Sequence, residues 1–310
     1  MKKLTIPCTD LQTSCFVLGN MRISGLSEEK LYELIRTALD LGINFFDHAD
    51  IYGSGECEKH FGRVLEAHPE LRSEMVIQTK CDIVTGEHGG PRYETTKDYI
   101  IRQARQSIEN LKCGYLDFLL LHRPDPLMDP HEVADAFDEL EKEGLVRHFG
   151  VSNFPSSKMR MLQKFVKQPL KINQIQLSAV HALPIDEDVF FDMNDERADS
   201  KSGHILDYAL EEDILLQAWC PLQASWADGF FIDHPKYPEL NRILDDLARK
   251  YEVSKTAIAA AWLLRLPQKI QVIAGTTNPE HLREMAKGAD IRLTAQEWYD
   301  IYTSCHHPLP

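Results

Sequence analysis

The sequence has no paired cysteine motif and no long apolar run. Its seven cysteines are scattered and never spaced as Cys-x-x-Cys, so neither a disulfide framework nor a zinc knuckle is expected. No stretch of about 18 consecutive apolar residues occurs, and the first residues lack the apolar centre of a signal peptide. The sequence therefore predicts a protein of the reducing cytoplasm with no membrane partner.

Positive charge is also scarce. The chain has 34 basic and 48 acidic residues and a formal net charge of -14, which repels a phosphate backbone, so nucleic acid is not an expected partner. Its share of hydrophobic residues (43%) is that of an average globular protein. A chain of 310 residues suits one α/β barrel, so we expect a single domain over residues 1–310. The oligomeric state stays open, and we favour a monomer.

Short apolar runs alternate with amphipathic stretches along the chain. Ser27 and Gly42 bound the first expected helix, and Asp129 and Gly144 bound a later one. Parallel strands need a crossover connection, which is usually a helix, so eight such units predict a closed (β/α)8 TIM barrel. The eight expected strands are residues 16–18, 43–47, 76–80, 116–122, 146–152, 172–176, 214–219 and 270–274.

One alternative architecture and two long connections bear on this prediction. A doubly wound open sheet also alternates strands and helices, but no Gly-x-Gly-x-x-Gly follows the first strand. Two long connections, residues 182–203 and 223–238, interrupt the alternation of strands and helices. Connections of this length are usually functional or mobile. The second carries Trp226, Phe230 and Phe231, which indicates a lid.

Ionisable side chains stand where several of the expected strands end. Asp47, Lys80 and His122 each end a strand, and Tyr52 follows the first of these strands in the next loop. Taken singly, each has an ordinary structural explanation, such as a helix cap or a solvated charge. Because the carboxyl ends of barrel strands meet at one mouth, the four together predict an active site.

These four residue types suit acid catalysis without a metal. A tyrosine is a weak acid at neutral pH unless a nearby cation stabilises its phenolate, and Lys80 can supply that charge. Asp47 can hold Lys80 in place and keep it protonated. A neutral His122 can donate a hydrogen bond to the same substrate oxygen, which would polarise a carbonyl group.

The motifs around these residues resemble those of the aldo-keto reductase superfamily. Residues 47–53 are similar to its Asp-x-Ala-x-x-Tyr-Gly motif, 78–80 to its catalytic lysine strand, 121–122 to its histidine strand, and 150–154 to its cofactor-amide strand. The resemblance runs from about residue 4 to the C-terminus. Residues 122–129 and 146–150 are similar in particular to a bacterial oxidoreductase branch of the family.

The resemblance implies a function and a set of cofactor contacts. It implies NAD(P)H-dependent reduction of aldehydes or ketones to alcohols, with Tyr52 as the proton donor of a tetrad with Asp47, Lys80 and His122. The remaining implied residues bind the cofactor: Ser152, Asn153 and Gln174 the carboxamide, Trp219 the face of the nicotinamide ring, and Cys220, Pro221 and Leu222 the start of the pyrophosphate loop.

One segment departs from the family pattern. Many members bind the adenosine 2′-phosphate with a lysine and an arginine, but Gly275 stands here at the lysine position and His281 at the arginine position. Asn278, followed by proline, still indicates a helix start, whose N–H groups with the hydroxyls of Thr276 and Thr277 could bind a phosphate. We therefore favour NADPH over NADH.

Other function classes use parts of the same sequence. A metal-dependent barrel hydrolase would use Asp47, His48, His122 and His181 as ligands, but no His-x-His pair occurs, and His48 should point away from Asp47 across the strand. We therefore expect no metal.

A non-catalytic, nucleotide-sensing subunit of the same fold remains an alternative, although the intact tetrad argues against it. The substrate is a small carbonyl compound whose identity the sequence leaves open. Specificity is expected around Met21 and Trp226.

Overall fold

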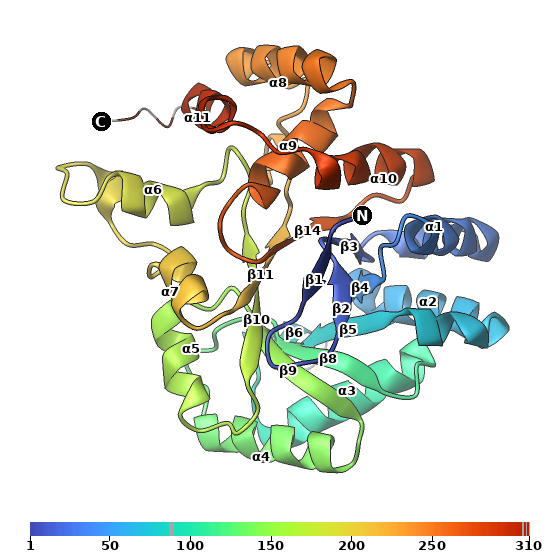
Figure 1. The fold of residues 1–310 in the computed structure, drawn as a ribbon. Helices are drawn as coiled ribbons and strands as arrows, with labels where there is room; N and C mark the ends of the chain where they lie inside the picture. The colour runs from blue at the N-terminus through green and yellow to red at the C-terminus, as the bar shows by residue number, and fades with distance from the viewer. Residues whose placement is uncertain (87–89, 306, 308, 310) are drawn as a thin grey trace.

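The computed structural model describes residues 1–86, 90–305, 307 and 309. Within them, eight parallel strands form the centre: β3 (Phe16–Gly19), β4 (Phe45–Asp47), β5 (Val76–Cys81), β8 (Leu116–Leu121), β9 (Val146–Ser152), β10 (Leu170–Gln176), β11 (Leu215–Trp219) and β14 (Ile270–Ala274). They pair in the order β10-β11-β14-β3-β4-β5-β8-β9 and close into a barrel (Figure 1). The predicted (β/α)8 barrel is confirmed, with each strand within two residues of its expected bounds.

Helices surround the strands (Figure 1). Those that follow the barrel strands are α1 (Glu28–Asp40), α2 (Glu56–Ala67), α3 (Lys97–Leu111), α4 (Pro130–Lys142), α5 (Ser156–Gln163), α7 (Ile205–Glu211), α9 (Lys255–Leu264) and α10 (Pro279–Ala286). Additional helices are α6 (Leu183–Val189), α8 (Pro238–Tyr251) and α11 (Ala295–Ser304). None of the helices in the described part of the chain has the length and apolar character needed to cross a bilayer.

Local signals account for where these helices begin and how closely they pack. The Ser27 side chain accepts a hydrogen bond from the Lys30 N–H at the start of α1, and Asp129 does the same for α4 with His131, as their sequence positions predict. Gly62 lets α2 approach α3, because an added Cβ would lie 1.9 Å from the carbonyl oxygen of Asn110.

The two long connections contain short secondary structure, whose form the sequence left open. Residues 182–203 contain the helix α6. Residues 223–238 contain a short hairpin, β12 (Gln223–Ser225) with β13 (Gly229–Phe230). Trp226 is 71% exposed on this hairpin but Phe231 is fully buried, so Phe231 belongs to the core and not to an aromatic lid. Helices and strands this short span too few repeats of the hydrophobic pattern to be recognised from the sequence.

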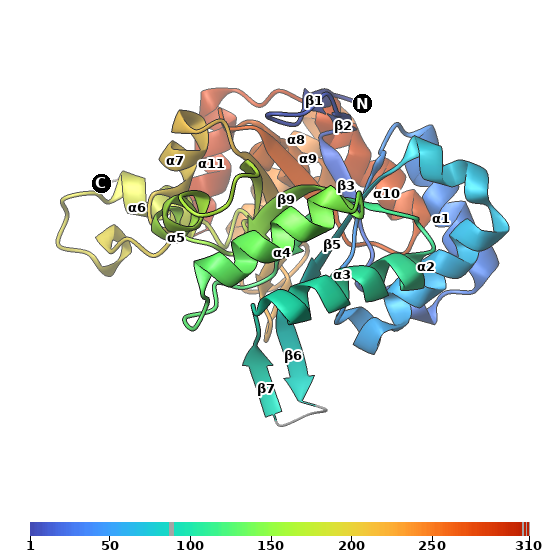
Figure 2. The same cartoon turned by 90° about the horizontal axis from the view of Figure 1, so that it is seen from below.

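Two further hairpins mark opposite ends of the barrel (Figure 2). β1 (Lys3–Thr5) pairs with β2 (Gln12–Ser14) at the amino-terminal end, which we call the floor. β6 (Ile83–Gly86) pairs with β7 (Gly90–Tyr93) after β5, at the carboxyl-terminal end, which we call the mouth. Between them the barrel interior is packed mainly with apolar side chains, which are Ile6, Val17, Phe45, Val76, Phe118, Leu120, Ile172, Leu215 and Ile273.

Candidate active site

The four predicted tetrad residues lie together at the mouth. Asp47 ends β4, Lys80 is the penultimate residue of β5, and His122 directly follows β8. These three strands are neighbours in the barrel, so their carboxyl ends converge. Tyr52 opens a short 3-10 helix, Tyr52–Gly55, in the loop after β4. The topology therefore brings the side chains of all four residues to one point.

Lys80 is the centre of this arrangement and is fully buried. Its Nζ atom donates to both carboxylate oxygens of Asp47, at 2.8 and 2.9 Å, and to the His48 carbonyl oxygen at 2.6 Å. It also donates to the Tyr52 hydroxyl oxygen at 3.1 Å. Burial lowers the pKa of Lys80, but Asp47 and Tyr52 raise it by more, so the net pKa lies above its usual value and Lys80 is charged.

Tyr52 is a neutral phenol in this setting. Burial raises the pKa of Tyr52 above its usual value of 10, and the charge on Lys80 offsets only part of that rise. Lys80 therefore lowers the pKa of Tyr52, as expected, but not far enough to bring it below its usual value. Because the hydroxyl oxygen accepts from Lys80, its own proton is free to be donated to another group.

His122 lies edge-on to Tyr52, with ring centroids 6.2 Å apart and an interplanar angle of 83°. Burial, and then the charges of Lys80 and Arg123, hold the pKa of His122 well below its usual value, so the ring is neutral. Its Nδ1 atom is buried and has no hydrogen-bond partner among the described residues. A bare Nδ1 costs less there than an N–H without an acceptor, so the proton belongs on Nε2.

Left-handed backbone occurs in several loops at the mouth. Of the eleven non-glycine residues with positive φ angles in the described part of the chain, four lie in loops that follow barrel strands: Ser54 at 56°, Asp82 at 99°, Asn153 at 61° and Cys220 at 51°. Such conformations cost free energy and persist where surrounding structure imposes them, as at functional sites. The loops that follow β4, β5, β9 and β11 are therefore held in specific shapes.

The residues predicted to bind the cofactor carboxamide are brought together in part. Asn153 donates to the Ser152 hydroxyl at 2.8 Å, and the Trp219 indole N–H donates to the Asn153 side-chain oxygen at 3.0 Å. Gln174 differs, because its amide nitrogen donates into the barrel, to Asp47 at 3.0 Å and to Gln217 at 3.1 Å. Ser152, Asn153 and Trp219 thus form one linked group beside the tetrad, and Gln174 supports Asp47 from below.

A row of buried amides, which we call the glutamine row, extends from Asp47 toward the floor; it consists of Gln78, Gln174, Gln217 and Gln271. Gln78 donates to Asp47 at 2.6 Å and to Gln217 at 2.8 Å. Gln217 donates to Gln271 at 2.9 Å, and Gln271 donates to a carbonyl oxygen of the floor hairpin at 2.7 Å. Of the four residues only Gln174 was expected to have a role, although a glutamine within an otherwise apolar strand was a signal for the other three as well.

The segment expected to bind the 2′-phosphate lies between β14 and α10. Asn278 caps α10 by accepting from the Glu280 N–H, which confirms the predicted helix start. The Thr276 hydroxyl oxygen accepts from the Asn278 N–H at 3.1 Å, so that N–H is already engaged. Gly275 and His281 are exposed, and Thr277 is half-buried.

Arg22 is a further residue at the mouth that the sequence analysis did not single out. It follows β3 and donates from Nη1 to the Gly275 carbonyl oxygen at 3.4 Å. Its charge also partly offsets the burial that raises the pKa of Cys220, which places it near the loop that begins with Cys220, Pro221 and Leu222. A cation thus stands where the two expected phosphate-binding loops approach each other.

The residues of the metal-hydrolase alternative do not converge. The His48 ring packs against Phe61, with centroids 4.5 Å apart, and burial followed by the charge of Lys80 lowers the pKa of His48 to about 3. Across residues 1–86, 90–305, 307 and 309, no group of three or more His, Cys, Asp or Glu side chains is placed to share a metal ion.

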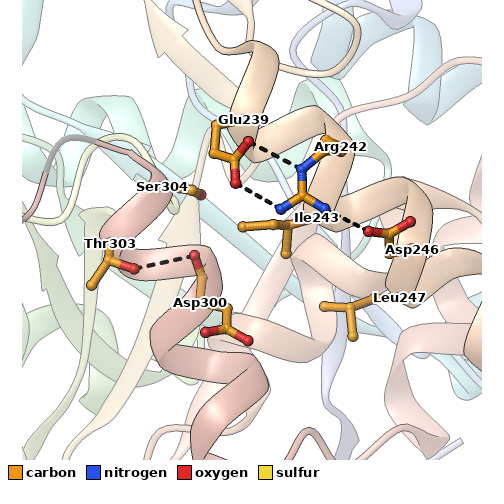
Figure 3. Close-up of a pocket in the computed structure, with 8 residues that line it drawn as sticks. All are labelled: Glu239, Arg242, Ile243, Asp246, Leu247, Asp300, Thr303 and Ser304. Carbon is orange, nitrogen blue, oxygen red and sulfur yellow. Dashed lines mark hydrogen bonds and ion pairs between the residues drawn. The ribbon is translucent and has the colours of Figure 1, made fainter.

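A surface hollow between α8 and α11 is separate from this site (Figure 3). Arg242 is paired there with Glu239 at 2.7 Å and with Asp246 at 2.8 Å, so its charge is already satisfied. The hollow lies on outer helices and not on loops at the mouth. Its lining residues are Glu239, Arg242, Ile243, Asp246, Leu247, Asp300, Thr303 and Ser304.

Comparisons with known proteins agree with this geometry. The sequence profile of the Aldo/keto reductase family matches residues 16–304. The chain is 36% identical to the oxidoreductase YdhF of Escherichia coli (strain K12) over 308 residues, which are 97% of this chain and 96% of that protein. It is 33% identical to a 6-dehydroglucose reductase of Agrobacterium fabrum (strain C58 / ATCC 33970), over 94% of each chain.

Solved structures share the fold. A Bombyx mori aldo-keto reductase in complex with NADP superposes with a TM-score of 0.73, at 19% identity, over 98% of this chain and 92% of that one. The matching family and the names of these relatives indicate an oxidoreductase. The chain belongs to the aldo/keto reductase family.

Proposed function

We propose that this protein reduces aldehydes or ketones to alcohols, with NADPH as the hydride source and Tyr52 as the proton donor. The observation that carries the proposal is the Lys80 ammonium group, which joins the Asp47 carboxylate to the Tyr52 hydroxyl inside the mouth. No other function that we considered requires a charged lysine held against a phenol.

The side chains divide the work as follows. The Tyr52 O–H and the His122 Nε2–H both donate to the carbonyl oxygen and polarise the C=O bond. NADPH, when bound, supplies the hydride to the carbonyl carbon. Tyr52 transfers its proton to the oxygen as negative charge develops there, and Lys80 stabilises the phenolate that is left. Asp47 holds Lys80 in position throughout.

The mouth has groups that suit a dinucleotide. Asn153, held in a left-handed conformation beside Trp219, offers an amide for the carboxamide and the indole offers a face for the ring. Arg22 offers a cation for the phosphates, next to the Gly275 loop. That a related barrel was solved with NADP supports a nicotinamide cofactor, and the preference for NADPH over NADH is part of the proposal.

The printed names of the relatives support catalysis, since one is an oxidoreductase and another a reductase of a dehydro-sugar. The alternative of a nucleotide-sensing subunit without catalysis requires none of the contacts made by Lys80. Retention of the whole tetrad therefore favours an enzyme.

The decisive experiment is Tyr52→Phe, which removes the proton and keeps the shape of the ring. Cofactor affinity, followed by quenching of tryptophan fluorescence, should stay close to normal, while turnover of an activated aldehyde falls about 100-fold or more. Tyr251→Phe is the matched control, because its hydroxyl also donates a hydrogen bond, to Glu297, but far from the mouth. A Tyr52→Phe protein that turns over like the parent would contradict the proposed mechanism.

A further inference from the structure

Arg123 places its guanidinium group beside an aromatic ring at the mouth. The residue follows β8, and its guanidinium carbon lies 6.0 Å from the centre of the ring of Trp219, which ends β11. The Trp219 indole donates to Asn153, directly after β9, so the ring leans toward the side of the mouth where β8 ends. The charge of Arg123 also contributes to the lowered pKa of His122, so the guanidinium group lies near both of these side chains.

The guanidinium group has no counter-ion in the part of the chain that the structure describes. Among the described residues, Arg123 forms no side-chain hydrogen bond or ion pair, although acidic residues outnumber basic ones by 48 to 34. Arg72 shows the usual arrangement, since its guanidinium donates to Asp117 at 2.9 Å and to three backbone carbonyl oxygens. A half-buried arginine whose five N–H donors lack protein acceptors is available for a ligand.

The backbone of Arg123 is fixed from below. Both carboxylate oxygens of Asp82 accept from the Arg123 N–H, at 3.0 and 3.2 Å, and Asp82 holds its left-handed φ of 99° to do so. On the other side, Asn153 donates to the carbonyl oxygen of His122 at 3.3 Å. The peptide that joins His122 to Arg123 is therefore clamped between two loops, which fixes the backbone from which the Arg123 side chain extends.

We propose, on the basis of the function proposed above, that Arg123 binds a carboxylate group of the substrate, so that the preferred substrates are aldehydes or ketones that also carry a carboxylate. The planar guanidinium matches two carboxylate oxygens with parallel N–H donors. A protein with a net charge of -14 repels anions at long range, so recognition of such a substrate requires a local cation at the reacting site.

The test compares an acid with its own ester. 4-Formylbenzoate and methyl 4-formylbenzoate share the reacting aldehyde and differ in charge, and succinic semialdehyde with its methyl ester gives an aliphatic pair. The parent should show a higher kcat/KM for the acid of at least one pair. In Arg123→Gln, the acid-to-ester ratio of kcat/KM should fall about 10- to 100-fold, the range for one lost charge-assisted interaction. Arg123→Lys should restore part of the ratio.

The matched control is Arg102→Gln. Arg102 also lies over an aromatic ring, with its guanidinium carbon 5.1 Å from the centre of Tyr99, but it is on the outside of α3. This variant should leave the acid-to-ester ratio unchanged.

Three results would overturn the proposal: a parent that prefers both esters, an Arg123→Gln protein with an unchanged ratio, or a loss confined to cofactor affinity, which would assign Arg123 to the cofactor. If no aldehyde is turned over at all, the reductase function fails instead. Calorimetric binding of 4-(hydroxymethyl)benzoate against its methyl ester, in the parent and in Arg123→Gln, then decides on Arg123 separately.

Discussion

The floor and the mouth of the barrel differ in the kind of polar group that each buries. Both ends must place polar groups in a buried interior. At the floor the groups are neutral, and Gln271 donates to Ser14 and Thr13 of the β1–β2 hairpin while its oxygen accepts from Gln217. At the mouth the groups are charged, as with Lys80, or lack a partner, as with the Nδ1 atom of His122.

This difference separates residues that stabilise the fold from residues that act on a ligand. Fully paired neutral amides contribute to stability and offer nothing to a substrate. Buried charges and unpaired polar atoms cost stability, and they are found at the mouth, where a cofactor and a substrate would supply the missing partners. Substitutions at the mouth should therefore change turnover first, and substitutions at the floor should change stability first.

The largest effect is expected for Lys80→Met. Turnover should fall about 100-fold or more because Tyr52 loses the cation that stabilises its phenolate. The unfolding free energy should also fall by about 3 kcal/mol, because Asp47 is left buried without its counter-ion. Lys269→Met is the control, since Lys269 pairs with Asp213 on the outer surface at 2.6 Å and should change neither.

Asp47→Asn should lower turnover less than Lys80→Met, because the charge on Lys80 remains. Steady-state kinetics and urea unfolding on the same preparations compare all these variants. A Lys80→Met enzyme with near-normal turnover would remove the tetrad assignment.

A pair of glutamine substitutions tests the comparison directly. Gln271→Met at the floor should lower the unfolding free energy by about 2 kcal/mol, because it leaves buried partners unpaired, with kcat/KM unchanged. Gln78→Met should cost similar stability but should also lower kcat by about 10-fold, because Gln78 orients the carboxylate of Asp47 at 2.6 Å. If both variants lose turnover equally, the two ends are not functionally distinct.

Asp82→Asn should change how stability depends on pH. Burial raises the pKa of Asp82 from 3.8 to about 8, so the folded state holds this proton more tightly than the unfolded state. The resulting stabilisation is complete below about pH 4 and is lost as the pH rises through about 8. The loss of unfolding free energy between pH 5 and pH 8.5 should therefore be smaller in Asp82→Asn, by roughly 4 kcal/mol.

Urea unfolding of the parent and of Asp82→Asn at the two pH values measures this difference. His48 and His122, whose pKa values are lowered, add stability as the pH rises toward about 6.5. They do so in both proteins, so their contribution cancels. Equal slopes in the two proteins would show that Asp82 is ionised in the native state.

The smallest effect concerns the cofactor. Without a lysine at position 275 or an arginine at position 281, NADPH should bind more tightly than NADH by about 10-fold or less, since charge-assisted bonds are roughly twice as strong as neutral ones. Fluorescence titration with both cofactors measures the ratio. Tighter binding of NADH would overturn the preference.

The sequence predicted the barrel and the tetrad because both depend on periodic features. Apolar runs at regular spacing define the strands, and Asp47, Lys80 and His122 stand at equivalent strand ends. Gln174 shows the limit, because its strand position was clear but the direction of its amide depends on Gln217 and Asp47. The position of the Arg123 side chain likewise depends on which side chains surround it at the mouth, and the spacing of residues along the chain does not define them.

The glutamine row has a consequence for spectroscopy. A carboxylate only accepts hydrogen bonds, so Gln78 and Gln174 must turn their NH2 groups toward Asp47, and both also donate to the oxygen of Gln217. Gln217 must then turn its own NH2 group toward Gln271. The negative charge of Asp47 thus determines which way the NH2 group of every glutamine in the row points. The side-chain NH2 resonances of Gln271, near the opposite end of the barrel, should therefore report whether Asp47 is ionised.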